Sequence, residues 1–452
     1  MIKIRTGCML AAVAMAIFCL WSCQPNTEYE TKAANPEYLH RSMKRLTDVI
    51  VHDIFSPPVA SRIYAYPSIA AYEALIHDYP EYQSMAGQLH ELTELPQPEA
   101  GAEYCFPLAS VHALLKTGKH FVFSEDSIAT FEADIYKEFR SMMPASVYER
   151  SMAFGDAIAE HVIKWSDGDN YKQTRTFPKF TVNDQPGRWL PTPPDYMDGI
   201  EPHWNKIRPF IIDSATQFVP IRPTGYDMTP GSPFYQEVME VYETGKQLDE
   251  EKKEIAQFWD CNPYVSHHQG HVMFATKKIT PGGHWIGIVK IACQEADADM
   301  MKTAEAYART AIALADAFIS CWDEKYRSSL IRPETVINQH IDESWAPLLQ
   351  TPPFPEYTSG HSVISSAAAV ALTDLFGEPF HFIDSTEVEY GLPPREFNSF
   401  LEASSEAAIS RLYGGIHYMP AIQNGVDQGK KVGHYVVAHL KTRKEADVAQ
   451  GN

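Results

Sequence analysis

Apolar residues recur every three or four positions along most of the chain, which is the spacing of amphipathic helices. The first such stretch runs from Pro36 to Phe55 and stops where Ser56 is followed by two prolines. The same spacing predicts helices over Ala60–His77, Val111–Phe121, Ser127–Phe139 and Tyr148–Trp165, and, after helical periodicity returns at Pro233, over Gln294–Trp322, Ser362–Phe376, Glu396–Tyr413 and Lys431–Thr442. Alternating strand patterns are scarce, so the body of the protein is predicted to be helical.

The composition changes between Asp167 and Pro233, where proline, glycine and aromatic residues replace the helical periodicity. A segment of this kind is expected to wind irregularly over the helices instead of forming a domain. The whole pattern predicts an all-α fold of two packed helical bundles with long irregular connecting segments. We expect an N-terminal helical region with this irregular wrap at 36–231 and a C-terminal helical domain at 232–445.

The first residues are typical of an export signal. Lys3 and Arg5 precede an apolar run that is too short to span a membrane comfortably and that ends in Leu-Trp-Ser-Cys at 20–23. This ending resembles a bacterial lipoprotein box, from which Trp21 departs. The resemblance implies a signal peptide at 1–22, a lipid on Cys23 and a polar tether at 23–35. The expected location is therefore outside the cytoplasm, with a lipid anchor in a membrane and the body facing the periplasm or the cell surface.

Composition narrows the range of partners. The chain has 452 residues, 44% of them hydrophobic, and a formal net charge of −20. Nucleic acid is therefore not an expected partner, and a site for an anion must be a local basic pocket within a repelling surface. The cysteines after Cys23 are too widely spaced for a CxxC metal or redox motif, and they either pair or are buried thiols. They are Cys105, Cys261, Cys293 and Cys321.

Three short blocks near the C-terminus contain the residue types that bind a tetrahedral oxyanion. They are K-x6-R-P from Lys325 to Pro333, S-G-H from Ser359 to His361, and S-R-x5-H from Ser410 to His417. Cations neutralise a phosphate-like charge, and backbone amides of a glycine turn at a helix start add directed donors. One histidine can then be a nucleophile or ligand and the other a proton donor. The candidate site residues are Lys325, Arg332, Ser359, Gly360, His361, Arg411 and His417.

Each block also has a purely structural interpretation. Lys325 and Arg332 would share one face of a helix, yet isolated cations are usually solvated. Ser359 could be a plain N-cap, with His361 incidental. The glycines after Arg411 could simply end a helix. The order and spacing of all three blocks together favour one common site.

Taken together, the blocks resemble the signature K-x6-R-P, P-S-G-H and S-R-x5-H-x3-D of the superfamily of type 2 phosphatidic acid phosphatases and vanadium-dependent haloperoxidases. The resemblance covers roughly Glu295 to His439, and a looser similarity to the haloperoxidase-like branch extends to 189–194 and His284-Trp285. It implies that His417 attacks phosphorus or binds the vanadium of vanadate, and that His361 is the general acid or base. The residues implied to hold the oxygens of phosphate or vanadate are Lys325, Arg332, Ser359, Gly360 and Arg411.

Two positions depart from this signature. Thr358 stands where the phosphatase pattern usually has proline, and Ala421 stands where it has the aspartate that orients the nucleophilic histidine. The phosphatase interpretation therefore requires Asp427 or a backbone carbonyl to take that role. Trp322 and Phe354 resemble aromatic residues that line the pocket of chloroperoxidase-like members, although ordinary core packing also explains them.

Three functions stay open. The haloperoxidase-like branch implies an oxidoreductase with vanadate as cofactor, which oxidises a halide or a related nucleophile with hydrogen peroxide; Lys325, His361 and His417 would be catalytic. The alternative is an acid-phosphatase-type hydrolase without a cofactor, which cleaves phosphomonoesters or lipid phosphates through a phosphohistidine. The third is a surface lipoprotein that binds an oxyanion or a glycan without catalysis.

A separate group of histidines could bind a metal. His267 and His271 would lie on one face of a helix, with His268 beside them. Gly270 disfavours a helix there, and the glutamate of an HExxH motif is absent. We therefore expect a loop near the mouth of the pocket.

Overall fold

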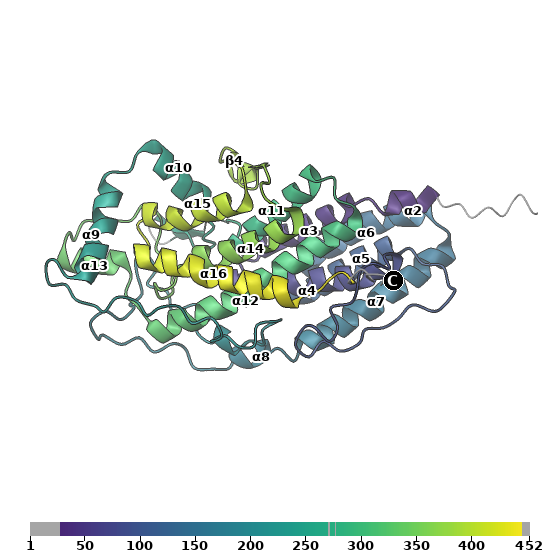
Figure 1. Ribbon diagram of the computed structural model, residues 1–452, viewed down its shortest axis with the longest axis horizontal. Coiled ribbons are helices and arrows are strands. Elements are labelled where there is room, and N and C mark those ends of the chain that lie inside the picture. Colours follow the sequence, from purple (N-terminus) through teal and green to yellow (C-terminus); the bar gives the residue numbers. More distant parts are fainter. Residues whose placement is uncertain (1–27, 270–271, 276, 445–452) are drawn as a thin grey trace, which may run out of the picture.

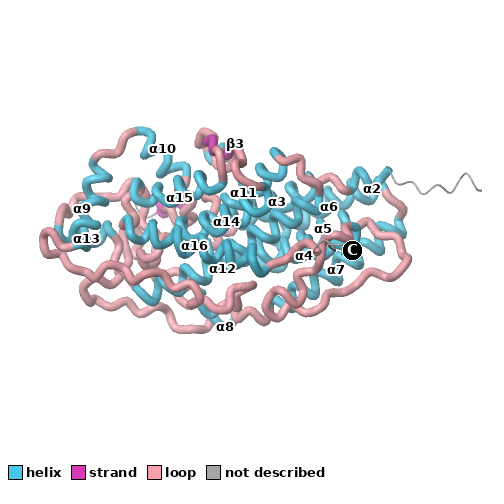
Figure 2. Tube along the Cα trace, viewed as in Figure 1, coloured by secondary structure: helices cyan, strands magenta, loops and turns pink. Residues whose placement is uncertain are grey.

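The computed structural model describes residues 28–269, 272–275 and 277–444. Helices form the body of an elongated molecule, with the N-terminal helices toward one end (Figure 1). Strands are few in the described chain (Figure 2) and pair antiparallel in two short hairpins, β1 (Ser266–Gln269) with β2 (Val272–Ala275) and β3 (Phe382–Asp384) with β4 (Arg395–Phe397). The predicted all-α fold of packed helical bundles is confirmed.

The first bundle is built around a helix that is buried along its whole length. This helix, α4, begins with the proline pair at 57–58 after Ser56, whose side chain accepts a hydrogen bond from the Val59 amide. It packs against α5 and α7. The helices of this part are α2 (Glu28–Ala33), α3 (Glu37–His52), α4 (Pro57–Leu75), α5 (Phe106–Phe121), α6 (Glu125–Met142) and α7 (Ala145–Ser166).

The second bundle is organised by a long central helix, α12, which packs against α14 and α16 of its own bundle and against α4 of the first. The main cluster of buried apolar residues therefore runs through both bundles. The division at 231/232 stays a prediction. The helices here are α9 (Pro233–Lys246), α10 (Glu250–Phe258), α11 (Pro281–Glu295), α12 (Met300–Ser328), α13 (Pro333–His340), α14 (Gly360–Phe376), α15 (Phe400–Tyr413) and α16 (Met419–His439).

The segment between the bundles is irregular, as its composition predicted. It contains only the short helices α8 (Tyr171–Thr174) and η2 (Trp204–Lys206) among its described elements. The buried carboxylate of Asp316 on α12 fixes this wrap, because it accepts hydrogen bonds from the backbone N–H groups of residues 210–212 at 2.7, 2.9 and 3.0 Å. These amides lie outside regular structure and would otherwise be buried without partners.

Several predicted helix boundaries were wrong. The helix expected over Gln294–Trp322 is two helices, since α11 ends at Glu295 and α12 begins after Asp299, which caps the amide of Lys302. The last helix begins at Met419 instead of Lys431. Its glycines conceal the helical pattern in the sequence, although they serve a packing role. The start of the predicted Glu396–Tyr413 helix belongs to β4, and α15 begins after the cap at Ser399.

Three other expectations also require correction. Lys325 and Arg332 do not share a helix face, because α12 ends at Ser328 and Arg332 is the N-cap of α13. Part of the predicted tether is folded, since α2 buries Tyr29 and Ala33 against the body. The histidines at 267 and 268 lie in strand β1 instead of the expected loop; position 271, the other member of the possible metal pair, lies outside the described residues.

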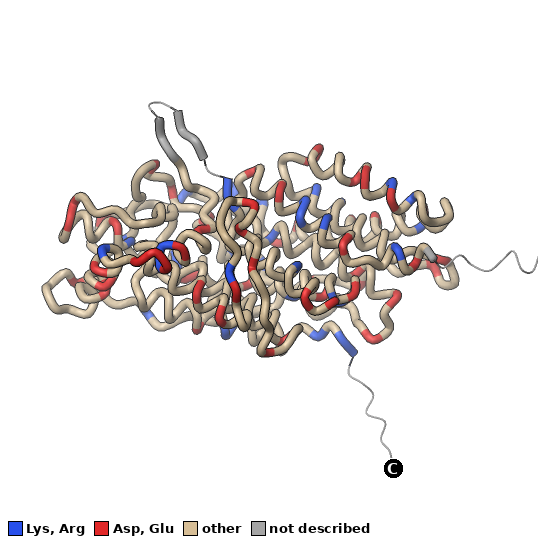
Figure 3. The backbone as a smooth tube through the Cα atoms, turned by 90° about the horizontal axis from the view of Figure 1, so that it is seen from above, with Lys and Arg blue, Asp and Glu red and all other residues tan. Residues whose placement is uncertain are grey.

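The four cysteines at 105, 261, 293 and 321 are all buried and unpaired. Acidic residues are spread over the length of the molecule (Figure 3), in agreement with the negative net charge. Within the part of the chain that the structure describes, no helix is both long and apolar enough to cross a membrane. The predicted signal peptide at 1–22 and Cys23 lie outside the described residues.

The contact between α14 and α16 depends on glycine. A Cβ atom on Gly429 would lie 2.0 Å from the carbonyl oxygen of Val363, and one on Gly433 would lie 2.9 Å from that of Ala367. Real Cβ atoms do not approach backbone this closely, so the two helices must cross where α16 has no side chain. This close crossing positions the start of α14 beside the start of α16, where the site is built.

Gly429→Ala is therefore expected to lower the free energy of unfolding by about 1–3 kcal/mol or more, because the helices must separate. Thermal or urea unfolding measures the change. Gly225→Ala is the matched control, since its added Cβ would have no atom within 4 Å. An equally stable Gly429→Ala variant would contradict this account of the helix crossing.

Candidate active site

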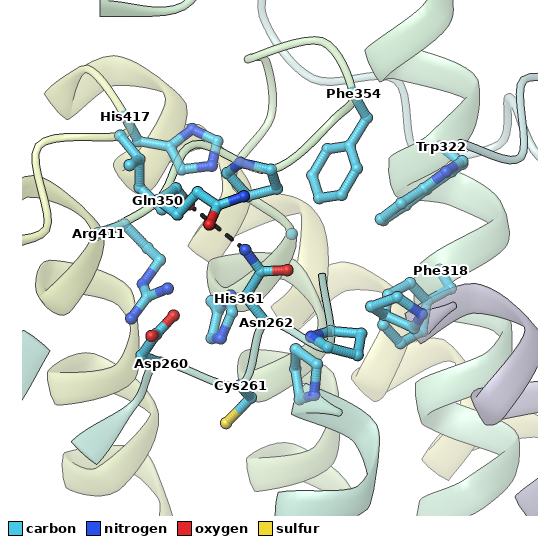
Figure 4. A pocket seen from close by; sticks show the side chains of 16 residues that line it. Asp260, Cys261, Asn262, Phe318, Trp322, Gln350, Phe354, His361, Arg411 and His417 are labelled. Carbon is cyan, nitrogen blue, oxygen red and sulfur yellow. Dashed lines mark hydrogen bonds between the residues drawn. The ribbon is translucent and has the colours of Figure 1, made fainter. Parts of the chain in front are cut away.

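The three sequence blocks converge, as their order and spacing predicted. Lys325 comes from the last turn of α12, His361 from the first turn of α14, and Arg411 from the last turn of α15. His417 lies in the turn between α15 and α16, after Gly415, whose φ of +77° suits a residue without a side chain. Figure 4 shows Arg411, His361 and His417 on one side of the pocket and the aromatic side chains on the other.

His417 is held by a carboxylate that the sequence analysis did not identify. Its Nδ1 lies 2.8 Å from Oε1 of Glu356, which also accepts the backbone N–H of Tyr418 at 3.0 Å. Glu356 is fully buried, in the segment that leads to the S-G-H block. Glu356 thus orients His417, the role for which the sequence analysis considered Asp427 or a backbone carbonyl. It takes the place of the aspartate that the signature has at the position of Ala421.

The contacts of His417 define its tautomer. Nη1 of Arg332 donates to Nε2 at 3.1 Å and also to the carbonyl of Ile416 at 2.8 Å. Nε2 is therefore the acceptor, and Nδ1 carries the proton that is donated to Glu356. Burial and the charges of Arg332 and Lys325 hold the pKa of His417 well below its usual value, so the ring is neutral. A lone pair on Nε2 is thus directed toward the cationic side of the site.

Lys325 is fully buried and bound to the loop before the S-G-H block. Its Nζ donates to the carbonyl oxygens of Pro355, Glu356 and Thr358 at 3.0, 3.1 and 2.6 Å. It also lies 5.0 Å from the ring centre of Phe354. Burial lowers the pKa of this amine to about 7. Lys325 therefore holds the loop in place and contributes positive charge without an N–H group spare for an oxyanion in this conformation.

The two arginines differ in what they leave available. Nε of Arg411 donates a hydrogen bond to the hydroxyl of Ser410, and its Nη2 donates to the carbonyl oxygen of Trp259 at 2.8 Å. The carboxylate of Asp260 lies beside the guanidinium (Figure 4). Arg332 is fully buried and has an Nη2 atom with no partner among the described residues. Burial lowers the pKa of Arg332 to about 10, which leaves the guanidinium charged.

The S-G-H block forms the start of α14. Ser359 is the N-cap, and its side chain accepts the amide of Ser362 at 3.3 Å, so the structural interpretation of this residue is correct as far as it goes. Its hydroxyl proton and the partial positive charge of the helix start stay available to an anion. His361 has a buried Nε2 without a partner, and burial and Arg411 keep its pKa well below the usual value. The ring is therefore neutral and can accept a proton.

The opposite wall is apolar. The rings of Trp322 and Phe354 have centroids 5.0 Å apart, and Phe318 packs on Trp322 at 5.3 Å. Phe354 also lies against the Arg332 guanidinium, at 5.2 Å from its ring centre. Both predicted aromatics line the pocket. Lining residues that sequence reasoning missed are Pro57, Asp260, Cys261, Asn262, Pro263, Pro281, Phe318, Gln350, Pro352 and Ile416.

Comparisons with known proteins agree with this geometry. The family model described as the VCPO second helical-bundle domain matches residues 305–445. A solved structure described as the first bacterial vanadium-dependent iodoperoxidase is similar at 53% identity, with a TM-score of 0.87, over 91% of this chain and 98% of that one. Comparison with curated proteins gives no match.

A solved holo-type bacterial vanadium-dependent chloroperoxidase shares the fold at 18% identity, with a TM-score of 0.65, over 86% of this chain and 94% of that one. The apo-type structure gives a TM-score of 0.64 over 86% and 95% of the two chains. The chain belongs to the vanadium-dependent haloperoxidases, the haloperoxidase branch of the superfamily that also contains the type 2 phosphatidic acid phosphatases.

The residues present fit vanadate. Two buried donors or acceptors, Nη2 of Arg332 and Nε2 of His361, lack partners, which is costly unless a ligand satisfies them. Nε2 of His417, which accepts a hydrogen bond from Arg332 in this conformation, would supply one nitrogen ligand in place of that contact. His417 would hold the vanadium, while Arg332, Arg411 and Ser359 would hold the surrounding oxygens.

Glu356→Gln is expected to weaken vanadate binding by about 10- to 100-fold, because the glutamine keeps the shape but not the charge that orients His417. Burial raises the pKa of Glu356 to about 7, so the measurement belongs at pH 8, where the carboxylate is ionised. Titration calorimetry of the vanadate-free protein gives the dissociation constant. Glu73→Gln is the control, since this buried carboxylate contacts Ser84 and Met85 beside the first bundle. Equal affinity in both variants would contradict the role of Glu356.

The affinity should also depend on the protonation of Lys325. Its pKa of about 7 means that the anion-free protein loses this positive charge as the pH rises above 7. Anion binding then requires proton uptake, so affinity falls, by at most tenfold per pH unit. The ratio of wild-type to Lys325→Arg affinity between pH 7 and 9 isolates this effect, since vanadate's own ionisation is common to both proteins. A constant ratio would show that Lys325 does not titrate in this range.

Proposed function

We propose that this protein oxidises halide, with iodide as the preferred one, using hydrogen peroxide and bound vanadate. The observation that carries the proposal is the neutral His417, whose Nε2 lies against the Arg332 guanidinium while Glu356 fixes Nδ1. The similar structure at 53% identity is described as an iodoperoxidase, which supports iodide as the substrate. When bound, vanadate supplies the Lewis acid that activates hydrogen peroxide.

The residues of the chain have separate tasks in this reaction. His417 provides the nitrogen ligand, and Glu356 keeps its second nitrogen protonated. Arg332 and Arg411 neutralise the charge of the bound anion in a site from which bulk water is excluded, where such charges act strongly. The neutral Nε2 of His361 can take the proton that hydrogen peroxide loses when it binds.

The apolar wall supports the choice of iodide. Phe318, Trp322 and Phe354 face the imidazoles across the pocket (Figure 4) and offer polarisable surface with few hydrogen-bond donors. Iodide is the least strongly hydrated of the common halides, so it loses the least when it leaves water for such a wall.

The test is a halide oxidation assay with purified protein, vanadate and hydrogen peroxide. Iodide should give rapid triiodide formation, bromide slower bromination of a dye, and His417→Ala should abolish both because it removes the nitrogen ligand. His381→Ala is the control, since that histidine is exposed and contacts Glu396 at the surface. Full activity in His417→Ala would overturn the assignment of the ligand, and absence of iodide oxidation in the wild type would overturn the function.

One observation favours phosphate-ester hydrolysis as the second candidate. The residue that should orient a nucleophilic histidine is present after all, as Glu356, so His417 could attack phosphorus and His361 could protonate the leaving oxygen. Release of p-nitrophenol from p-nitrophenyl phosphate by vanadate-free protein tests this activity. Hydrolysis that disappears in His417→Ala, with no halide oxidation by the wild type, would make this candidate the function.

We further propose that the protein is exported and anchored by a lipid on Cys23. The support is the apolar run and the Leu-Trp-Ser-Cys ending at 20–23 in the sequence. Because α2 begins at Glu28 and packs on the body, the anchor would hold the first bundle close to the membrane. Metabolic labelling with a radioactive fatty acid tests the proposal. Incorporation should be lost in Cys23→Ser, and absence of label in the full-length wild-type chain would contradict the anchor.

A further inference from the structure

A second group of chemically active side chains lies directly behind the vanadate pocket. Cys261 follows α10, His284 is in the first turn of α11, and Glu387 lies in the loop after β3. All three are buried, with exposed fractions of 1%, 0% and 4%. Cys261 also lines the pocket, but in Figure 4 its sulfur points away from His417 and Phe354, toward the second group.

The three ligand atoms form a triangle of the size that a metal ion requires. Sγ of Cys261 lies 3.4 Å from Nδ1 of His284 and 3.8 Å from Oε1 of Glu387, and the nitrogen and oxygen are 3.1 Å apart. With bonds of about 2.3 Å to sulfur and about 2.0 Å to nitrogen or oxygen, tetrahedral ligands of zinc stand roughly 3.3–3.6 Å from one another. A cation between the three atoms therefore needs only small shifts.

A carboxylate behind the histidine completes the arrangement. Nε2 of His284 donates to Oδ2 of Asp384 at 2.7 Å, and Oδ1 of Asp384 accepts the amide and hydroxyl of Thr386 at 3.0 and 2.6 Å. This bond places the proton on Nε2 and leaves the Nδ1 lone pair directed at Cys261 and Glu387. Trp259 stacks on the imidazole at 4.5 Å and fixes the plane of the ring. Metal-binding histidines are commonly oriented in this way.

From this geometry we propose that Cys261, His284 and Glu387 bind one zinc ion, with a solvent molecule as the fourth ligand. Thiolate, imidazole and carboxylate are ligands that zinc accepts together, whereas calcium and magnesium prefer oxygen alone. The two negative ligands neutralise the dication. The alternative interpretation has no metal. In it, His284 is protonated and forms ion pairs with Asp384 and Glu387.

The zinc site would serve the vanadate pocket by fixing one of its walls. Cys261 lies between Asp260 and Asn262, which line the pocket. Two residues before Cys261, the carbonyl oxygen of Trp259 accepts a hydrogen bond from Arg411. The ion joins this segment to α11 and to the loop after β3, which are far apart in the sequence. Loss of zinc should therefore weaken vanadate binding through the position of Arg411, without any change in the vanadate ligand itself.

The experiment is elemental analysis of the full-length protein purified without chelators or added vanadate. We expect about one zinc per chain, loss of that zinc in Cys261→Ser, and retention in Cys105→Ser, another buried free cysteine outside the group. Replacement of zinc by cobalt should give the thiolate-to-cobalt absorption band and the visible bands of a tetrahedral site in the wild type and in Cys105→Ser only.

The wild type decides the proposal even when Cys261→Ser does not fold. Wild-type protein that holds no zinc after dialysis against zinc, and that gives no thiolate-to-cobalt band, overturns it and favours the protonated histidine. Zinc that is retained in a folded Cys261→Ser variant also overturns it. Zinc removed by a chelator should in addition raise the dissociation constant for vanadate, measured by calorimetry, and readdition of zinc should restore it.

Discussion

The structure depends on the burial of three like charges around one small cavity. Lys325, Arg332 and Arg411 are all removed from water within a protein whose net charge is −20. Such a group would repel itself, so each cation is bound to backbone carbonyl oxygens, and the carboxylates of Glu356 and Asp260 lie beside the group. The carbonyls stabilise the cations without cancelling their charge, which leaves the cavity attractive to an anion.

The helical framework supplies these carbonyls at fixed positions. The central helix α12 carries Lys325 and is held between the two bundles, while the glycine crossing of α14 and α16 brings the S-G-H turn beside His417. Loops then provide what helices cannot, since carbonyls within a helix are already bonded. The irregular segment before Ser359 gives three of its carbonyls to Lys325.

The chemistry of the site depends on the protonation states and tautomers of the two imidazoles. Both His361 and His417 are kept neutral by burial and by the cations around them. For His417, Glu356 and Arg332 together select the tautomer that offers Nε2 as a ligand or a nucleophile. A neutral His417 with an unprotonated Nε2 can bind vanadium or attack phosphorus. The apolar wall and the identity of the bound anion therefore separate halide oxidation from phosphate-ester hydrolysis.

The helical class, the irregular wrap and the residues that meet at the candidate site could be predicted from the sequence, because helical periodicity is local and the three blocks have a characteristic order and spacing. The sequence did not reveal Glu356 as the partner of His417, 61 positions away, or the grouping of Cys261 with His284 and Glu387, 23 and 126 positions away. These contacts arise from the packing of the folded chain. A lone buried carboxylate or thiol has no periodic pattern, and its partner is selected by how distant segments pack, not by its neighbours in the chain.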